Sequence, residues 1–385
     1  MRELRHVVFV PAIVSDGSKE HTMRVHKVIT SLAVVLLALP MIASAAEWGL
    51  KPGSPDIKTA GQLAFGPDGI LFVGDAMSAT VFAIDTQDKS SGKVSDVNVK
   101  GIDKKVSELL GSTATIRDMV VNPATGNIFL SASLASKAAI VRVDGATGKL
   151  SLVSLTDVPF SKAILPDAPE DKVTGEGRRK SNKRGESITD LAYHEGRVLV
   201  SGLSKSAAPS TVSSIDFPFA DTNYGVSLEI YHGAHGRYEN TSAVRAFVPF
   251  LIDGEPNVLA GFTCTPLVKF PVSSIGSKEK QVRGTTVAEL GNRNRPLDMI
   301  VYEKDGKHFV LMANSARGVM KIGTDTLSQK EGITSKVSGG GSAGQKYQTI
   351  EDLKGVVQLD RLNATSAVII TQTDAGTDLQ TVPLP

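Results

Sequence analysis

Short apolar runs separated by turn residues recur along the chain from about residue 58 onward. The first group holds apolar residues 63–65, the turn Pro67-Asp68-Gly69, apolar residues 70–73 and an alternating run at 80–84. Proline presets φ at the start of a turn and glycine accepts a positive φ at its end, so the pattern predicts strands joined by tight turns. Three such strands in succession make an antiparallel meander.

The meander is repeated six times at intervals near fifty residues. Aligned on one apolar position, the copies are 56, 72, 57, 51 and 58 residues apart, with anchors at Leu63, Met119, Leu191, Val248, Met299 and Val357. Repeats of this length built from β-meanders are typical of propeller blades, each packed on the next. We therefore predict an all-β protein with the fold of a six-bladed β-propeller. Seven blades are the alternative, because the 72-residue interval has room for a degenerate copy; a β-sandwich with accidental spacing is another.

The repeat is interrupted at two places. At about residues 155–186 we expect a charged insertion, because residues 165–187 are too poor in apolar side chains to bury a face. It is either a solvated surface loop or a flap over one propeller face. The glycine-rich residues 336–348 predict a flexible loop between the fifth and sixth blades. Because a propeller must hide its sheet edges, we also expect residues 57–65 and 355–385 to lie in or beside one closing blade.

The N-terminal region predicts export. Residues 23–46 read as a signal peptide, with basic Arg24 and Lys27, an apolar run at 28–42 and the small residues Ala43-Ser44-Ala45 before the cleavage site. The run is short for a bilayer span, and an uncleaved anchor is the alternative. Residues 1–22 would then be an over-extended gene start. Residues 47–385 would form a single propeller domain in the periplasm or outside the cell.

Charge and cysteine content limit the partners. The chain carries 42 Lys+Arg and 40 Asp+Glu, and without residues 1–45 it carries 37 of each. This balance argues against nucleic acid and anionic membranes as partners. One cysteine, Cys264, excludes an internal disulfide. We expect a monomer with no transmembrane segment after signal cleavage, whose partner is a small molecule or a protein ligand.

Candidate ligand-binding residues lie just before the repeat anchors, because the first strand of each blade lines the central channel. An aspartate directly precedes three anchors: Asp118, Asp190 and Asp298. We expect these to meet at one channel mouth and to bind a cation, an anion or a carbonyl group. The structural alternative is that each aspartate accepts backbone N–H groups and ties neighbouring blades together. The polar residues that accompany two of these positions are Arg117, Arg293, Asn294 and Arg295.

A second candidate site contains His232, His235 and Glu239, in a glycine-rich stretch. Imidazole and carboxylate are ligands for zinc and similar ions, so a divalent metal ion is the cofactor this spacing suggests. A polar loop that satisfies backbone groups is the alternative. No nucleophile elbow or helical pair of metal-binding histidines is present.

The meanders with Pro-Asp-Gly-type turns resemble exported NHL-type propellers and the gluconolactonase/strictosidine-synthase group, over roughly residues 58–385. Resemblance to the gluconolactonase-like members implies a divalent ion held in the channel by Glu, Asn and Asp. Glu186, Asn292 or Asn294, and Asp298 are of these types. The tryptophan pattern of quinoprotein blades is absent, since the chain has only Trp48.

Two classes of function follow from these patterns. The first is a binding module for a protein or small ligand, on one face or at the channel mouth. The second is a metal-dependent hydrolase or lactonase with a channel-centred site. No catalytic set is complete in the sequence, so the enzymatic class stays open.

Overall fold

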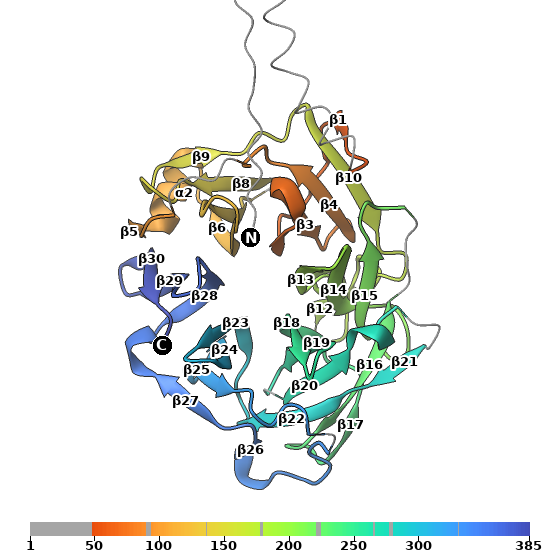
Figure 1. Cartoon of the computed structure of the whole chain (residues 1–385). Coiled ribbons are helices and arrows are strands. Elements are labelled where there is room, and N and C mark those ends of the chain that lie inside the picture. The colour runs from red at the N-terminus through yellow and green to blue at the C-terminus, as the bar shows by residue number, and fades with distance from the viewer. Residues whose placement is uncertain are drawn as a thin grey trace, which may run out of the picture. The chain divides into compact units, whose positions relative to one another are not determined.

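Six sheets with an almost entirely antiparallel strand order surround a central channel in the computed structural model (Figure 1). The model describes residues 48–89, 94–135, 137–177, 180–220, 225–264, 266–276, 280–329 and 331–385. All of them belong to one unit, Ala43–Pro385. The expected signal peptide and cleavage site lie outside the described residues, as do Arg178 and Arg179 of the expected insertion. Among the described residues, no helix has the length and apolar character needed to cross a bilayer.

The six sheets are the six predicted blades, numbered here by the order of their innermost strands in the chain. Blade 1 contains β2 (Leu63–Phe65), β3 (Ile70–Asp75), β4 (Thr80–Asp85), β10 (Val158–Ile164) and β1 (Lys51–Gly53). Blade 2 contains β6 (Thr115–Val121), β7 (Ile128–Ser133), β8 (Ala138–Val143) and β9 (Leu150–Leu152). Blade 3 contains β13 (Asp190–His194), β14 (Arg197–Leu203), β15 (Ser210–Asp216), β16 (Val226–His232), β17 (Arg237–Glu239) and β21 (Gln281–Arg283).

The remaining three blades follow in the second half of the chain. Blade 4 contains β18 (Val244–Ile252), β19 (Glu255–Phe262), β20 (Pro266–Pro271), β22 (Thr285–Leu290) and β26 (Ser342–Gly344). Blade 5 contains β23 (Pro296–Lys304), β24 (Lys307–Asn314), β25 (Gly318–Gly323) and β27 (Tyr347–Ile350). Blade 6 contains β28 (Val356–Arg361), β29 (Ser366–Thr373), β30 (Gly376–Pro383) and β5 (Asn98–Val99). The six-bladed prediction is confirmed.

The blades do not follow one another around the ring in sequence order. The innermost strand β2 contacts β6 and β13, and β6 in turn contacts β28. The apolar clusters agree, because Leu63 and Phe82 of blade 1 pack with Phe129 of blade 2, whereas Phe72 packs with Leu191 of blade 3. Blade 1 therefore stands between blades 2 and 3, and the ring order is 2, 1, 3, 4, 5, 6 (Figure 1).

Two outer strands are exchanged between distant parts of the chain. Strand β5, which follows blade 1 in sequence, completes blade 6 by pairing Val99 with Leu379. Strand β10, which follows blade 2, completes blade 1 by pairing with β4. The expectation that residues 57–65 would lie in or beside the same closing blade as 355–385 is therefore wrong, because blade 2 lies between blades 1 and 6. The long 72-residue interval contains β10 rather than a seventh blade.

The rest of the two interrupting segments is more regular than expected. After β10, the chain forms the hairpin of β11 (Val173–Thr174) with β12 (Ser181–Asn182), followed by the 3₁₀ turn η3 (Lys183–Glu186). Arg184 ties this segment to blade 1 by donating to the carbonyl oxygen of Met77 at 3.0 Å, and it holds the segment together by donating to that of Pro169 at 2.7 Å. Within 336–348, β26 pairs with β22, so that segment is not simply the loop we expected between blades 5 and 6.

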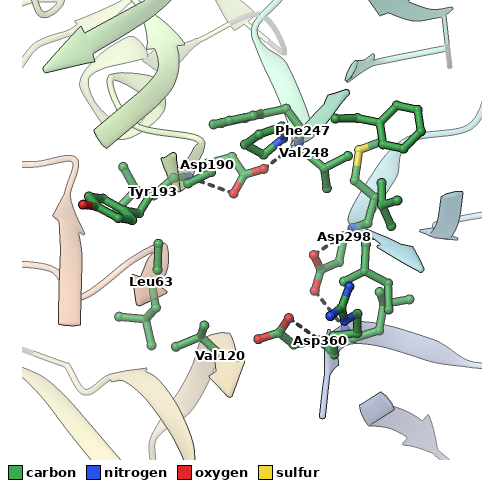
Figure 2. A pocket seen from close by; sticks show the side chains of 18 of the residues that line it. Leu63, Val120, Asp190, Tyr193, Phe247, Val248, Asp298 and Asp360 are labelled. Atoms are coloured by element: carbon green, nitrogen blue, oxygen red, sulfur yellow. Dashed lines mark hydrogen bonds between the residues drawn. The ribbon is translucent and has the colours of Figure 1, made fainter. Parts of the chain in front are cut away.

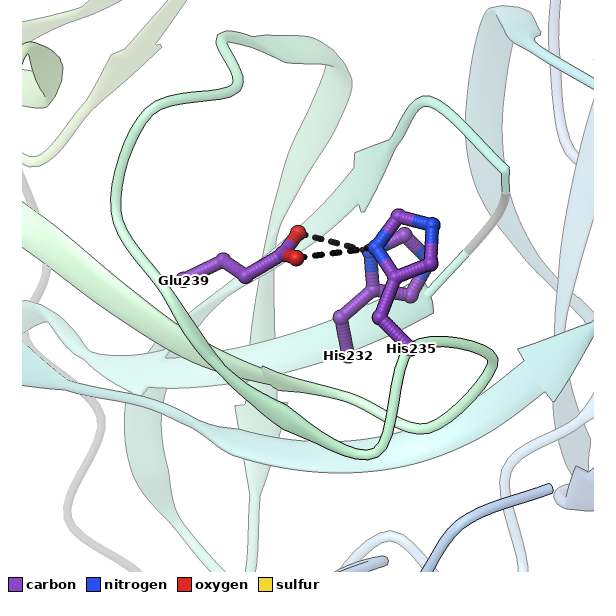
Figure 3. A group of neighbouring side chains, drawn as sticks. All are labelled: His232, His235 and Glu239. Atoms are coloured by element: carbon purple, nitrogen blue, oxygen red, sulfur yellow. Dashed lines mark hydrogen bonds and ion pairs between the residues drawn. The ribbon is translucent and has the colours of Figure 1, made fainter.

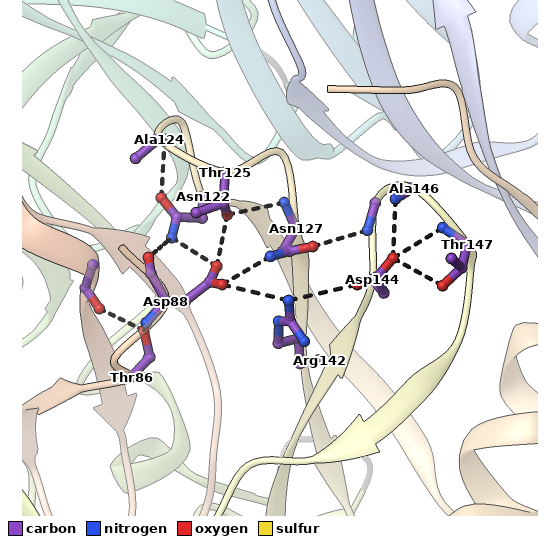
Figure 4. A network of polar contacts seen from close by, with 12 residues as sticks. Thr86, Asp88, Asn122, Ala124, Thr125, Asn127, Arg142, Asp144, Ala146 and Thr147 are labelled. Atoms are coloured by element: carbon purple, nitrogen blue, oxygen red, sulfur yellow. Dashed lines mark hydrogen bonds and ion pairs between the residues drawn. The ribbon is translucent and has the colours of Figure 1, made fainter. Parts of the chain in front are cut away.

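Polar contacts fasten blades 1 and 2 where the chain leaves β4 (Figure 4). The Asp88 carboxylate accepts hydrogen bonds from the side chains of Asn122, Thr125 and Asn127 at 2.9, 2.6 and 2.8 Å. Arg142 adds a guanidinium 3.5 Å away. The segment that follows β4 of blade 1 is thereby fixed to the first turn of blade 2. The helix α2 (Ile102–Leu110) follows β5 and packs Ile102 and Val106 into the cluster between blades 2 and 6.

Candidate functional site

Four aspartates on innermost strands line the channel, and each bridges two blades. Figure 2 shows three of them, Asp190, Asp298 and Asp360. Asp190 shows the pattern, because its carboxylate accepts the N–H of Leu191 at 2.8 Å and the N–H of Phe247, on the next blade, at 2.7 Å. The corresponding bonds to neighbouring blades are Asp118 to Leu63 at 2.7 Å, Asp298 to Leu359 at 2.8 Å and Asp360 to Val121 at 2.7 Å. These bonds are those of the structural alternative, in which each aspartate accepts backbone N–H groups and ties neighbouring blades together.

Three of the four aspartates are spaced in alternate blades around the ring. Asp118, Asp190 and Asp298 stand in blades 2, 3 and 5, and each bonds to the blade that follows it in ring order: 1, 4 and 6. The equivalent positions of those three partner blades hold Gln62, Ala246 and Gln358. Asp360 lies two residues beyond Gln358, so it sits one step further along the channel.

Burial raises the pKa values of all four channel aspartates. Burial raises the pKa of Asp190 to about 7 and that of Asp360 to about 6, against the backbone N–H bonds that favour the charged form. Burial also raises the pKa of Asp118 and of Asp298 well above the ordinary value, and repulsion among the channel aspartates adds to it. The carboxyl group of Asp190 is therefore partly protonated near neutral pH.

The ring of Asp118, Asp190 and Asp298 separates two chambers, both lined in part by these three residues. On one side is a chamber of about 670 Å³, here called the apolar chamber. Its characteristic lining residues are Val120, Leu191, Tyr193, Phe247, Val248, Phe250, Ile300 and Val301. On the other side is a chamber of about 570 Å³, here called the polar chamber. Its characteristic lining residues are Arg117, Arg245, Arg295, Gln62, Gln358, Gln372, Thr115, Thr189 and Thr377.

The three arginines of the polar chamber come from three different blades. Arg117 is exposed and uses Nε on the Ser133 hydroxyl at 2.8 Å. Arg245 is partly buried, and its Nη2 lies 2.7 Å from Glu186. Arg295 is exposed, and its side chain has no polar partner among the described residues. All three also line an adjoining cavity of about 530 Å³, so they stand where the polar chamber opens outward.

The structure brings together most, but not all, of the residues predicted for this mouth. Arg117, Arg295 and the three aspartates line the polar chamber, with the aspartates between the two chambers rather than at the mouth. Arg293 and Asn294 are not among the residues that line either chamber. Asn294 is buried and occupied, because Nδ2 donates to Asn314 at 3.2 Å and Oδ1 accepts the N–H of Ala316 at 3.1 Å. Sequence reasoning missed Arg245, although it occupies the residue before Ala246 in the same way that Arg117 precedes Asp118.

The divalent ion implied by the gluconolactonase-like resemblance does not fit these residues. Glu186 is ion-paired through both carboxylate oxygens, to Lys183 at 2.9 Å and to Arg245 at 2.7 Å. Burial would raise the pKa of Glu186, but these two cations hold it below its ordinary value. Asp298 already accepts two backbone N–H groups. Asn294 is engaged elsewhere, and its alternative Asn292 is not among the residues that line either chamber. The implied ligand set therefore does not converge on one point in the channel.

The predicted metal residues His232, His235 and Glu239 form a separate group at the outer edge of blade 3 (Figure 3). Nδ1 of His232 lies 2.9 Å from one carboxylate oxygen of Glu239, and Nδ1 of His235 lies 2.8 Å from the other. Potential ligand atoms of all three lie within 4.8 Å of one another. The group lies on the β16–β17 hairpin, away from the channel. Glu186, the fourth residue predicted to bind a metal, is not part of it.

Comparison with known proteins adds little beyond the fold. No protein-family model and no curated protein matches the sequence. Among solved structures, the chain is similar to the extracellular region of plexin A4, with 10% identity, 87% of this chain and 40% of that chain covered, and a TM-score of 0.42. It is also similar to a PQQ-bound aldose sugar dehydrogenase from Streptomyces coelicolor, with 11% identity, 87% and 97% covered, and a TM-score of 0.30. A third similar structure is PorZ, a surface component of the type-IX secretion system of Porphyromonas gingivalis. Its identity is 11%, the match covers 86% of this chain and 39% of that chain, and the TM-score is 0.34.

These scores carry no argument about function. The chain spans less than half of the plexin chain that it resembles. The sheets and the channel define a β-propeller, a fold that commonly serves as an interaction module. None of these comparisons narrows that class to the NHL or gluconolactonase group.

Proposed function

We propose that the protein is a binding module whose polar chamber receives a small anionic ligand rich in hydroxyl groups. The observation that carries this proposal is the convergence of Arg117, Arg245 and Arg295 on one chamber mouth. Two of these guanidinium groups are exposed, and each has donors to spare. Arginine binds carboxylate and phosphate through paired, charge-assisted hydrogen bonds, so an anionic group is the natural partner.

The deeper lining supports a ligand that also carries hydroxyl groups. Glutamine and threonine side chains surround the chamber, and they both donate and accept hydrogen bonds. The floor is made of Asp118, Asp190 and Asp298, whose raised pKa values let them act as hydrogen-bond donors as well as acceptors. A volume of about 570 Å³ lies in the usual range of small-molecule sites. None of the described residues that line this chamber is aromatic, so stacking is not part of the proposal.

The test compares three ligands of one shape and different charge: glucuronate, glucose and glucosamine. Calorimetric titration at low salt should give the order glucuronate, then glucose, then glucosamine, with about tenfold between the first and the last for each well-made arginine contact. The substitution Arg295→Gln should reduce this preference. The matched control is Arg361→Gln, because Arg361 lines the apolar chamber instead. Equal binding of the three probes, or tightest binding of glucosamine, would contradict the proposal.

We further propose that this binding takes place outside the cytoplasm, with a mature N-terminus at Ala46 or Glu47. The proposal rests on the basic residues, the short apolar run and Ala43-Ser44-Ala45 in the sequence. N-terminal sequencing of the protein recovered from the periplasm or medium should begin at one of these residues. Recovery of the protein in the cytoplasm with Met1 or Met23 intact would refute export.

A channel-centred metal hydrolase is not favoured, because the residues that would hold the metal are engaged in other bonds. The binding module therefore stands as the single proposal for the channel.

A further inference from the structure

We propose that His232, His235 and Glu239 form a zinc-binding site on the outer rim of the propeller, separate from the channel. The three residues belong to the turn and flanking strands of one hairpin, where Ile230 pairs with Glu239 and His232 with Arg237. Two imidazole nitrogens and a carboxylate oxygen are a common zinc ligand set, which leaves a fourth position for solvent or another ligand. Figure 3 shows both rings directed at the same carboxylate.

The geometry is close to what a tetrahedral ion requires. The two Nδ1 atoms lie 2.9 and 2.8 Å from the oxygens of Glu239. Zinc bonds of about 2.0–2.1 Å place tetrahedral ligand atoms about 3.3 Å apart, so each of these nitrogen–oxygen pairs has to open by about 0.5 Å. The two rings also have to turn toward one shared point, since they now face different oxygens of Glu239. The side chain of His235 is 49% exposed, which gives an ion direct access from solvent. The site therefore needs a local adjustment rather than a rearrangement.

The hairpin that carries the ligands is already held in place by other parts of the chain. The N–H of Gly233 donates to Glu289 of blade 4 at 2.5 Å, and the N–H of Val337 donates to the carbonyl oxygen of Gly233 at 2.9 Å. A Cβ at Gly233 would lie 2.9 Å from Cγ of Glu289, so the close approach of the turn to Glu289 leaves no room for a side chain. Binding then costs little ordering of the backbone.

The two nitrogens of the His232 ring differ in their partners. Nδ1 pairs with Glu239, whereas Nε2 is buried with no hydrogen-bond partner among the described residues. An ion at Nδ1 takes the place of that pairing and leaves the ring proton on Nε2. This proton has no acceptor and opposes binding, so the bonds from the ion to both histidines and to Glu239 have to offset it.

Arg237 is a cation that opposes the binding of an ion here. Its Nε lies 2.9 Å from Glu239, and its side chain is 72% exposed. It therefore competes for one carboxylate oxygen, but it is able to turn away into solvent. Removing this charge with Arg237→Gln should tighten zinc binding about three- to tenfold, because the repulsion between a dication and a nearby cation is lost. A purely structural hydrogen-bonded cluster would show no such gain.

The test is a zinc titration of the purified full chain, stripped with a chelator, against a chromogenic competitor at pH 7. We expect one equivalent of zinc to bind. The substitution His235→Ala should weaken binding about 100-fold or more, since losing a group that merely orients a ligand already costs about 10- to 100-fold. The matched control is His308→Ala, because His308 is similarly exposed, 3.9 Å from Glu303, without a second histidine. It should bind zinc like the wild type.

The outcome does not depend on one fragile variant. His235 is half exposed and bonds to Glu239 alone among the described side chains, so His235→Ala should fold, and circular dichroism checks this. Zinc should raise the melting temperature of the wild type but not of His235→Ala. Absence of saturable zinc binding, or equal affinity in His235→Ala and His308→Ala, would overturn the site. Glucuronate binding to the channel should be unchanged by zinc or chelator, so the two proposals fail independently.

Discussion

Substituting Asp190 by asparagine tests whether the channel aspartates are a strained part of the propeller near neutral pH. Asp190 accepts two backbone N–H groups, one on its own strand and one on blade 4. The amide of asparagine has one oxygen, so one of these N–H groups loses its acceptor. We expect this loss to cost about 1–3 kcal/mol, the usual penalty for an unpaired buried polar group. Asparagine does not ionise, however, so the variant avoids the cost of a buried carboxylate at higher pH.

The pH dependence of stability follows from the raised pKa. The pKa of Asp190 is raised from 3.8 to about 7 by folding, so between these values the folded state holds a proton that the unfolded state has lost. Stability therefore falls as pH rises through this window. At about 1.4 kcal/mol per pH unit, the loss between pH 5 and pH 7 is at most about 3 kcal/mol. Because the side chain is partly exposed to the channel, we expect about half of this.

Urea denaturation of the wild type and of Asp190→Asn at pH 5 and pH 8 measures the difference. The variant should be less stable than the wild type at pH 5 by about 1–3 kcal/mol, and close to it at pH 8. The control Asp374→Asn alters an exposed turn aspartate and should leave the pH dependence unchanged. If Asp190→Asn is less stable than the wild type by the same unfolding free energy at both pH values, burial of the Asp190 charge does not destabilise the wild type at pH 8. That result would refute the prediction.

Two further substitutions test the fastening of the ring. Asp88→Ala leaves several side-chain donors of blade 2 without an acceptor and should lower the unfolding free energy by about 2–4 kcal/mol. Asp144→Ala, in a more exposed turn, is the control. Equal losses of the two variants in urea denaturation would contradict the role of Asp88 in fastening blades 1 and 2. Val99→Asp places a charge in the strand that completes blade 6 and should lower the unfolding free energy by about 3 kcal/mol or more. Asn98→Asp, at the exposed neighbouring residue, is the control. Similar melting temperatures of the two variants would show that β5 does not stabilise the ring.

The repeat pattern was sufficient to predict six blades because each blade brings its own apolar periodicity. It also located Asp118, Asp190 and Asp298, since each stands directly before an anchor that the structure confirms. The anchors Val248 and Val357 lie one and two residues from Phe247 and Leu359, whose N–H groups donate to the aspartate of the neighbouring blade. Asp360 was missed for this reason, because it lies beyond the repeat position.

The ring order was not available from the sequence. The pairing of Val99 with Leu379 joins strands from opposite ends of the domain, and a period along the chain does not specify which blades become neighbours. The engagement of Glu186 and Asn294 was hidden for a similar reason. Their partners Arg245 and Asn314 are distant in sequence, and only tertiary structure reveals that these polar groups are already paired.

A crystal structure determined in the presence of glucuronate tests the central claim most directly. The account predicts that the carboxylate lies at the mouth of the polar chamber within hydrogen-bond distance of Arg117 or Arg295, with its hydroxyl groups facing the glutamines and the aspartate ring. Glucuronate bound in the apolar chamber, or on the outer surface away from these arginines, would contradict it.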